Sequence, residues 1–191
     1  MPSRDHTVDE DALPVMVPRS EKRLVATQAE RVLRLKAHLE KALEGMSPSD
    51  SPAPVRPEPA GFPAQVIRSA CTLCRGWCCR NGGDDAFLDA CAMARVHHAQ
   101  PCPDIQATVQ VYLDRVPDTG YEGSCIFHGS HGCTLDRSMR SDVCNAYFCG
   151  GLHAYLSGGE TYAPTVVIAG EGRKMQTSRV LLPGNTSRRT P

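Results

Sequence analysis

The amino-acid sequence predicts a small, irregular α+β fold, built mostly of short helices and loops and ending in a β-hairpin. Fifteen prolines and sixteen glycines stand against four phenylalanines and one tryptophan, and this balance favours a small core with much irregular chain. All ten cysteines lie between Cys71 and Cys149, so one part of the chain carries an unusual density of thiols. Two β-branched runs near the end of the chain predict the hairpin. The length of 191 residues fits one domain with flanking segments.

Two segments before the cysteines are rich in proline. Residues 1–19 also carry many charges, and we expect a flexible arm there. Within this arm, three consecutive residues form a short apolar patch that can dock on another surface: Val15, Met16 and Val17. Residues 47–63 contain six prolines, which exclude both helix and sheet and predict an extended, semi-rigid linker.

An amphipathic helix is predicted between these segments, over residues 20–46. Ser20 can cap its beginning, and Gly45 can end it. Apolar residues form a stripe at helical spacing: Leu24, Val32, Leu35, Leu39 and Leu43. Such a stripe usually packs on the core of its own protein or on a second copy. The alternative is that this N-terminal helix binds an unknown protein partner.

The cysteine-rich region is predicted to span residues 64–160. A helix is expected from Asp84 to Ala99, with Cys91 as a small buried hydrophobic residue on it, and Cys102 between two prolines is not expected to bind metal. Residues 106–116 fit either a helix or a strand, and their β-branched side chains favour the strand.

The last predicted elements follow this region. Residues 135–143 predict a short helix, and residues 161–183 predict a β-hairpin around a glycine-containing loop. The polar tail at residues 184–191 is expected to be disordered.

The first group of cysteines has the spacing C-x2-C-x3-C-C. It consists of Cys71, Cys74, Cys78 and Cys79. A C-x2-C step is common in metal sites, because a short turn can direct both sulfurs towards one point. Adjacent side chains diverge on a helix or a strand. We therefore expect either that Cys78 and Cys79 face two different metal sites, or that one of them binds metal and the other only packs. More ligands must come from elsewhere in the chain.

The second group supplies four more thiols, with the spacing C-x7-C-x10-C-x4-C. It consists of Cys125, Cys133, Cys144 and Cys149. Eight thiolates fit two tetrahedral sites, or one iron–sulfur cluster with accessory thiols. We expect the two groups to meet, so that cysteine–metal bonds between the two halves of the chain close a metal-stapled domain. Such sites carry negative charge and need nearby cations. Four arginines close to these cysteines in the sequence can provide them: Arg75, Arg80, Arg137 and Arg140.

The surrounding composition favours metal over disulfides. Residues 1–10 lack the apolar stretch of a signal peptide, so we expect a cytoplasmic protein, and in a reducing cytosol a cysteine cluster is typical of metal binding. No apolar run has the length of a membrane span, so no membrane association is expected. Positive and negative charges balance at 21 each, and we therefore expect no nucleic-acid partner.

The two groups of cysteines together resemble the YkgJ-type cysteine-cluster family. The first group matches the family pattern in full, Cys125-Ile126-Phe127 resembles its Cys-Pro-Phe, and residues 140–144 resemble its Arg-Pro-x-x-Cys. The resemblance covers about residues 68–150. It implies a zinc- or iron-chelating domain, similar to the cysteine-rich part of flagellin lysine N-methylases. Three positions depart from the pattern: Ile126 and Ser141 replace proline, and Asn145 replaces arginine.

The spacing leaves the identity of the metal open. Zinc suits a closed site of four thiolates, and iron–sulfur clusters also use four cysteines. The resemblance to the methylases favours an iron–sulfur cluster, which implies electron transfer or a modification reaction. The alternative is a zinc-stapled protein-interaction module without catalytic activity. A thiol oxidoreductase is disfavoured, because the βαβ setting of such enzymes is absent. No catalytic residue is predicted.

Overall fold

The structure, a computed structural model, describes residues 12–46, 57, 59–100, 104–171 and 174–183. The chain divides into two compact units, each made of segments that are far apart in the sequence. We call residues 1–19, 58–74 and 148–191 the sheet unit, and residues 20–57 and 75–147 the helical unit. The predicted cysteine-rich region, residues 64–160, is therefore divided between the two units.

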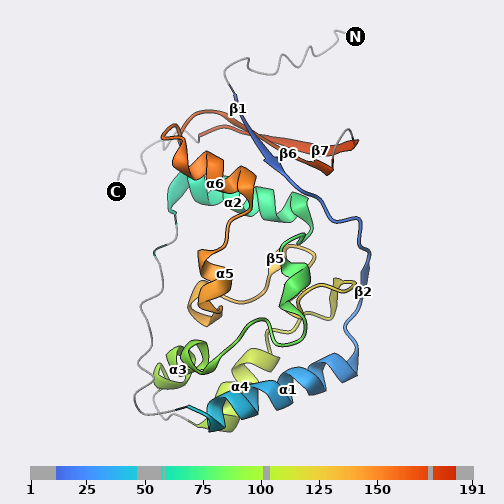
Figure 1. The fold of residues 1–191 in the computed structure, drawn as a ribbon, viewed down its shortest axis with the longest axis vertical. Helices are drawn as coiled ribbons and strands as arrows, with labels where there is room; N and C mark the ends of the chain where they lie inside the picture. The colour runs from blue at the N-terminus through green and yellow to red at the C-terminus, as the bar shows by residue number, and fades with distance from the viewer. Residues whose placement is uncertain (1–11, 47–56, 58, 101–103, 172–173, 184–191) are drawn as a thin grey trace, which may run out of the picture. The chain divides into compact units, whose positions relative to one another are not determined.

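The sheet unit is built on three strands in the order β1-β6-β7 (Figure 1). β6 (Thr165–Glu171) and β7 (Lys174–Leu181) form the predicted antiparallel hairpin. β1 (Leu13–Val17) runs parallel to β6, so the expectation of a flexible arm is wrong for these residues. The alternation of apolar residues explains the strand, because Val15 and Val17 point into the core of the unit while Met16 remains exposed. Residues 1–11 lie outside the described residues.

Two helices pack against this sheet. α2 (Gly61–Cys74) contacts all three strands, and α6 (Gly150–Ser157) lies against β1 and α2 (Figure 1). The proline-rich segment 47–63 was predicted to exclude helix, yet its last residues form the first turn of α2. Proline is tolerated there because the first amide groups of a helix have no acceptor within it. Residues 47–56 and 58, and the tail at 184–191, lie outside the described residues.

The core of the helical unit lies between α1 (Ala29–Glu44), α3 (Ala90–His98) and α4 (Ile105–Leu113). Leu35, Leu39 and Leu43 of α1 are buried there. They pack in one cluster with side chains from the rest of the unit, among them Leu88, Met93, Val109, Tyr112, Ile126 and Phe127. The apolar stripe of α1 thus packs inside its own unit.

The beginnings of two helices were predicted too early. α1 begins after Gln28 and not at Ser20, since β2 (Leu24–Ala26) pairs antiparallel with β3 (Thr119–Tyr121). α3 begins after Asp89, whose side chain accepts a hydrogen bond from the amide of Ala92. In both cases a strand or loop occupies the residues that the sequence assigned to the first turns.

The strand predicted at residues 106–116 is wrong. This segment forms α4, and Asp104 caps it by accepting a hydrogen bond from the amide of Ala107. Thr108, Val109 and Tyr112 are buried on one face, which is helical spacing. The capping residue and the burial of this face therefore outweigh the preference of the β-branched residues for a strand.

Short elements complete the helical unit. β4 (His128–Gly129) and β5 (Gly132–Cys133) form a small antiparallel pair, and a 3-10 turn, η1, covers Cys79–Gly82. The predicted helix at residues 135–143 is instead two pieces, η2 (Arg137–Met139) and α5 (Asp142–Ala146). Arg140 and Ser141 are extended between them, and the Ser141 side chain caps α5.

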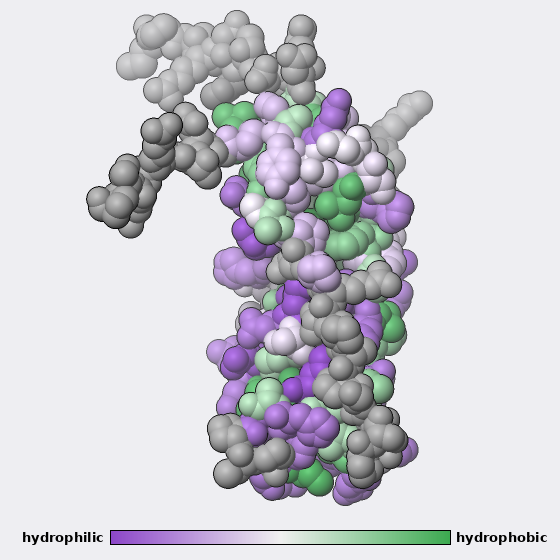
Figure 2. Space-filling view, turned by 90° about the vertical axis from the view of Figure 1, so that its left-hand side faces the viewer, coloured by the Kyte–Doolittle hydropathy of each residue, from purple (hydrophilic) through white to green (hydrophobic). Residues whose placement is uncertain are grey.

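Apolar residues on the surface are scattered. On the face shown in Figure 2, hydrophobic residues are interspersed with hydrophilic ones. The exposed large apolar side chains come from many different elements, among them Leu33, Phe87, Val143 and Tyr162. Single exposures of this kind are normal in soluble domains. Among the described residues, no helix has the combination of length and apolar character that crossing a membrane requires.

Candidate metal centre

The thiols of Cys78 and Cys79 interact with each other. Cys78 has helical backbone angles, and Cys79 begins η1. A hydrogen bond from the thiol of Cys79 lowers the pKa of Cys78 to about 7, and the same bond raises the pKa of Cys79. From the sequence, these adjacent side chains were expected to diverge, as they do on a regular helix or strand. In the structure, they are close enough for one sulfur to donate to the other.

Cys125 lies directly beside this pair. Its amide donates a hydrogen bond of 2.9 Å to the carbonyl oxygen of Cys79, and the amide of Ile126 donates to the carbonyl oxygen of Gly83. Gly82 makes the close approach possible, because a Cβ atom there would lie 2.9 Å from the Cβ of Cys125 and 3.2 Å from its Sγ. The two groups of cysteines, far apart in the sequence, are thus joined through backbone hydrogen bonds.

Cys133 and Cys144 extend this group of thiols. Cys133 stands opposite His128 in the β4–β5 pair, and the Sγ of Cys144 lies 3.9 Å from the carbonyl oxygen of Ala86. Burial, with smaller contributions from the charges of Cys133 and Cys144, raises the pKa of Cys125 to about 12. Burial also raises the pKa of Cys144, with contributions from Cys133 and Cys78. Electrostatic effects of this kind act over several ångströms, and they indicate that the five thiols share one part of the helical unit.

The remaining cysteines are placed differently. Cys71 is exposed and Cys74 is buried on the last turns of α2, and Cys149 is half-buried at the beginning of α6. These three residues belong to the sheet unit. Cys91 is half-buried on α3, and Cys102 lies outside the described residues.

Two arginines influence the thiols electrostatically. Arg140, which the sequence singled out, lowers the pKa of Cys144, and Arg31 lowers that of Cys125, in both cases against the larger effect of burial. Arg31 comes from α1 and donates hydrogen bonds to the carbonyl oxygens of Ser124 and Gly83. Nothing in the sequence near Arg31 indicated this role, because it lies forty residues before the first cysteine.

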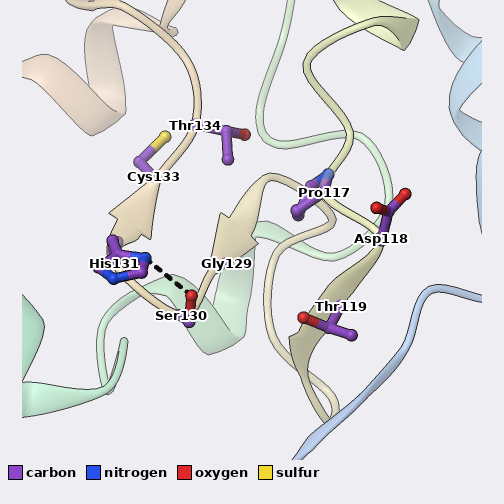
Figure 3. Close-up of a pocket in the computed structure, with 9 residues that line it drawn as sticks. Pro117, Asp118, Thr119, Gly129, Ser130, His131, Cys133 and Thr134 are labelled. Atoms are coloured by element: carbon purple, nitrogen blue, oxygen red, sulfur yellow. Dashed lines mark hydrogen bonds between the residues drawn. The ribbon is translucent and has the colours of Figure 1, made fainter.

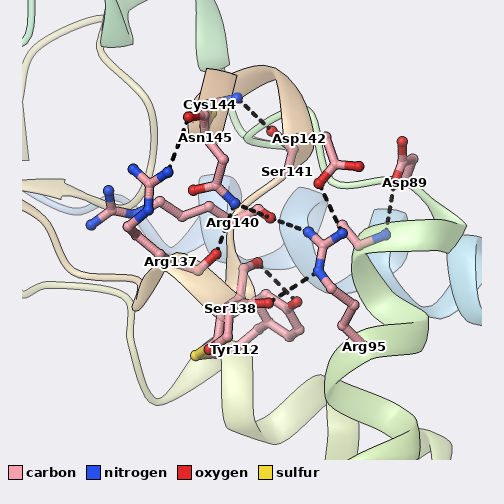
Figure 4. Close-up of polar contacts among 12 residues, drawn as sticks. Asp89, Arg95, Tyr112, Arg137, Ser138, Arg140, Ser141, Asp142, Cys144 and Asn145 are labelled. Carbon is pink, nitrogen blue, oxygen red and sulfur yellow. Dashed lines mark hydrogen bonds and ion pairs between the residues drawn. The ribbon is translucent and has the colours of Figure 1, made fainter. Parts of the chain in front are cut away.

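A polar network holds the segment that carries Cys144 (Figure 4). Arg95 is almost buried, with 7% of its side chain exposed, and donates to Asp142 at 2.9 Å and to the carbonyl oxygens of Ser138 and Arg140. Asn145 donates from Nδ2 to the carbonyl oxygen of Arg137, and the guanidinium group of Arg137 donates to the carbonyl oxygen of Asn145. Asn145 therefore fixes α5 to η2.

The turn that leads into Cys78 packs on a buried histidine. Arg75 and Gly76 both have left-handed backbone angles, and Gly76 lies over the ring of His128. The ring also stacks on Tyr121, with 5.0 Å between the centroids, and its Nδ1 is 3.0 Å from the Oγ of Ser124. Burial lowers the pKa of His128 to about 4, so the imidazole is neutral at physiological pH.

An open hollow of about 440 Å³ adjoins the β4–β5 pair (Figure 3). Asp118 and Thr119 line one side, and residues 129–134 line the other. The side chain of Ser130 hydrogen-bonds His131 at 2.9 Å. Cys133 is exposed and lines this hollow, so solvent reaches its thiol.

The donor set fits a thiophilic ion, although its present arrangement does not enclose one. Among the residues that the structure describes, no three His, Cys, Asp or Glu side chains converge closely enough to hold a metal ion. The five clustered donors of the helical unit are all sulfur, the ligand that Zn²⁺ and iron–sulfur clusters prefer. The side chains would have to move together on binding.

No family model, curated protein or solved structure matches this chain. The resemblance to the YkgJ-type family therefore stays a prediction from the spacing of the cysteines.

Proposed function

We propose that this chain is a metal-binding cysteine-cluster protein of the YkgJ type, with an iron–sulfur cluster as the favoured cofactor. The observation that carries this proposal is the hydrogen bond between the backbones of Cys125 and Cys79, which joins the two groups of cysteines. Around it gather thiols whose charges affect one another. A thiolate cluster held beside two guanidinium groups is a favourable setting for such a cofactor.

The role that we propose for the cofactor is electron transfer or a modification reaction in the cytoplasm. Cys133 is exposed and lines the hollow beside β5, so the group of thiols is accessible to solvent at this residue. Access of this kind suits a site that works on a partner or substrate, whereas a purely structural site is usually closed. When bound, an iron–sulfur cluster would accept and donate single electrons. The residues of this chain would hold it and set its electrostatic surroundings.

Anaerobic purification tests this proposal. We expect a brown protein with broad visible absorbance, and iron and acid-labile sulfide in stoichiometric amounts. Replacement of Cys125 by serine should abolish the colour, while replacement of Cys91 should leave it unchanged. A colourless wild-type protein that contains neither iron nor zinc would contradict the proposal.

A zinc-stapled interaction module is the second candidate. It is favoured by the short elements around the thiols, since β4 and β5 have two residues each and η2 has three. Such elements gain stability from metal cross-links. Colourless protein with stoichiometric zinc would select this candidate. Removal of the zinc by a chelator should then unfold residues around the cysteines and lower the stability of the helical unit.

A further inference from the structure

The sequence suggested that the eight cysteines divide into two groups of four, as they do along the chain. The structure groups them differently. Five lie in the helical unit, namely Cys78, Cys79, Cys125, Cys133 and Cys144, and three lie in the sheet unit, namely Cys71, Cys74 and Cys149. A tetrahedral site needs four thiolates. Only the helical unit contains that number.

Contacts within the helical unit bring four of these five residues, all except Cys133, around the loop of residues 82–86. Cys125 packs on Gly82 at the beginning of this loop, and the Sγ of Cys144 approaches the carbonyl oxygen of Ala86 at its end. The loop is closed by a hydrogen bond of 2.7 Å from the amide of Ala86 to the carbonyl oxygen of Gly82. Cys78 and Cys79 lie a few residues before this loop, and the carbonyl oxygen of Cys79 accepts a hydrogen bond from the amide of Cys125.

The loop itself is strained at the point that faces Cys144. Ala86 and Phe87 have positive φ angles of 53° and 56°, a conformation that residues other than glycine rarely adopt. Cys144 is held at this place by the hydrogen bonds of Arg95 and Asn145 to neighbouring backbone. Both sides of the approach between Cys144 and Ala86 are therefore fixed by the surrounding structure.

We propose that the helical unit by itself supplies a complete thiolate site for one thiophilic metal ion, with ligands drawn from Cys78, Cys79, Cys125, Cys133 and Cys144. This inference rests on the proposed function and makes it more specific, because it states that the sheet unit contributes no required ligand to this ion. Five sulfurs provide the four that a tetrahedral ion needs and one in addition. Arg31 and Arg140 supply positive charge beside it.

Anaerobic titration of the full chain with Co²⁺ tests this inference, because tetrahedral thiolate sites give intense sulfur-to-cobalt absorption. The decisive variant carries three substitutions in the sheet unit, Cys71→Ser, Cys74→Ser and Cys149→Ser. We expect it to keep one Co²⁺ ion with the thiolate spectrum. The double variant Cys125→Ser/Cys133→Ser leaves three of the five thiols, one fewer than a tetrahedral ion needs, and should weaken that ion at least about tenfold. Cys91→Ser, a thiol of the same unit, is the matched control and should bind as the wild type does.

The outcomes separate the inference from the proposed function. If the wild type binds Co²⁺ through thiolates but the triple variant does not, this inference is wrong while the proposed function stands. Unchanged binding by the double variant Cys125→Ser/Cys133→Ser would also overturn it. If the wild type binds no thiophilic ion, the proposed function fails as well. If that double variant is unstable, Cys133→Ser/Cys144→Ser gives the same test, because both of these thiols are exposed and their substitution should not disturb folding.

Discussion

Substitution of Gly76 by alanine should destabilise the helical unit strongly, because the new methyl group would meet the ring of His128. An alanine Cβ at this position would lie 2.0 Å from Cε1 and 2.4 Å from Nδ1 of that ring. The ring cannot move aside easily, since Tyr121 stacks on it and Ser124 binds its Nδ1. Gly76 also has a φ angle of 71°, which costs an alanine about 1–2 kcal/mol.

The two costs can be separated with a double-mutant cycle. Overpacking of a buried site costs about 1–3 kcal/mol, so Gly76→Ala should lower the free energy of unfolding by about 2–5 kcal/mol in the wild type. In a His128→Ala background the steric part disappears and only the backbone part, about 1–2 kcal/mol, should remain. The expected coupling between the two positions is therefore at least about 1 kcal/mol.

Urea denaturation followed by circular dichroism measures these free energies. The fluorescence of Trp77, the only tryptophan, reports on the adjoining turn at the same time. The comparison requires that the slope of the free energy against urea stays constant among the four proteins. An equal cost of Gly76→Ala in both backgrounds would refute the placement of this turn on His128.

Three further predictions concern the contacts that shape the two units. Gly82→Ala should lower the stability of the helical unit by about 1–3 kcal/mol, because the added methyl group would clash with Cys125. Urea denaturation measures this loss, and Gly150→Ala, whose added methyl group meets no other atom, is the control. Partial burial alone would raise the pKa of Asp84, but hydrogen bonds from Arg34 and Arg31 lower this pKa below its ordinary value. The ionised carboxylate should therefore stabilise the fold above its unfolded pKa, and this stabilisation should be lost as the pH falls through its folded pKa. Asp84→Asn should therefore cost about 1 kcal/mol at neutral pH and flatten the acid side of the stability profile, and an unchanged profile would contradict this. Gly151→Ala should disrupt the packing of α6 on β1, since its methyl group would lie 1.7 Å from the carbonyl oxygen of Met16. We expect proteases to cleave this variant faster than Gly150→Ala, and equal rates would contradict the prediction.

Sequence reasoning succeeded where local pattern and structure agree. The α+β class, the C-terminal hairpin and the burial of Leu35, Leu39 and Leu43 all follow from periodicity within a single segment. It failed where a distant partner decides the conformation. Leu24 was assigned to the stripe of a helix, but its segment pairs with residues 119–121, and nothing near Leu24 indicates that partner.

The error at α4 has a different cause. The necessary signal was present, since Asp104 is a good capping residue and lies three residues before Ala107. The density of β-branched residues was given more weight than this cap and than the helical spacing of Val109 and Tyr112. Preferences for strands depend strongly on packing context, whereas a cap is a specific hydrogen bond. For short segments of mixed character, the capping signal is the better guide.

The candidate site was only partly predictable for a similar reason. The sequence indicated which cysteines form groups along the chain, and it led us to expect that the two groups meet. The structure places Cys78 and Cys79 beside Cys125, but whether these thiols hold a metal stays a prediction. The division of the cysteines between two units was not visible, because the sheet unit joins both ends of the chain to residues 58–74, and the helical unit joins the two segments that lie between them. The contribution of Arg31 was hidden for the same reason.

The distribution of the apolar core bears on whether a bound metal would mainly stabilise the fold, as a staple, or take part in chemistry, as a working site. The side chains of α1, α3 and α4 pack in one cluster that also includes Ile126 and Phe127, which directly follow Cys125. Arg95 and Asn145 fix the segment around Cys144 through hydrogen bonds to its backbone. The backbone that presents these thiols is therefore held by packing and hydrogen bonds of its own. A site whose scaffold is already formed can bind and release an ion or change its redox state without unfolding, and this favours the working site over the staple.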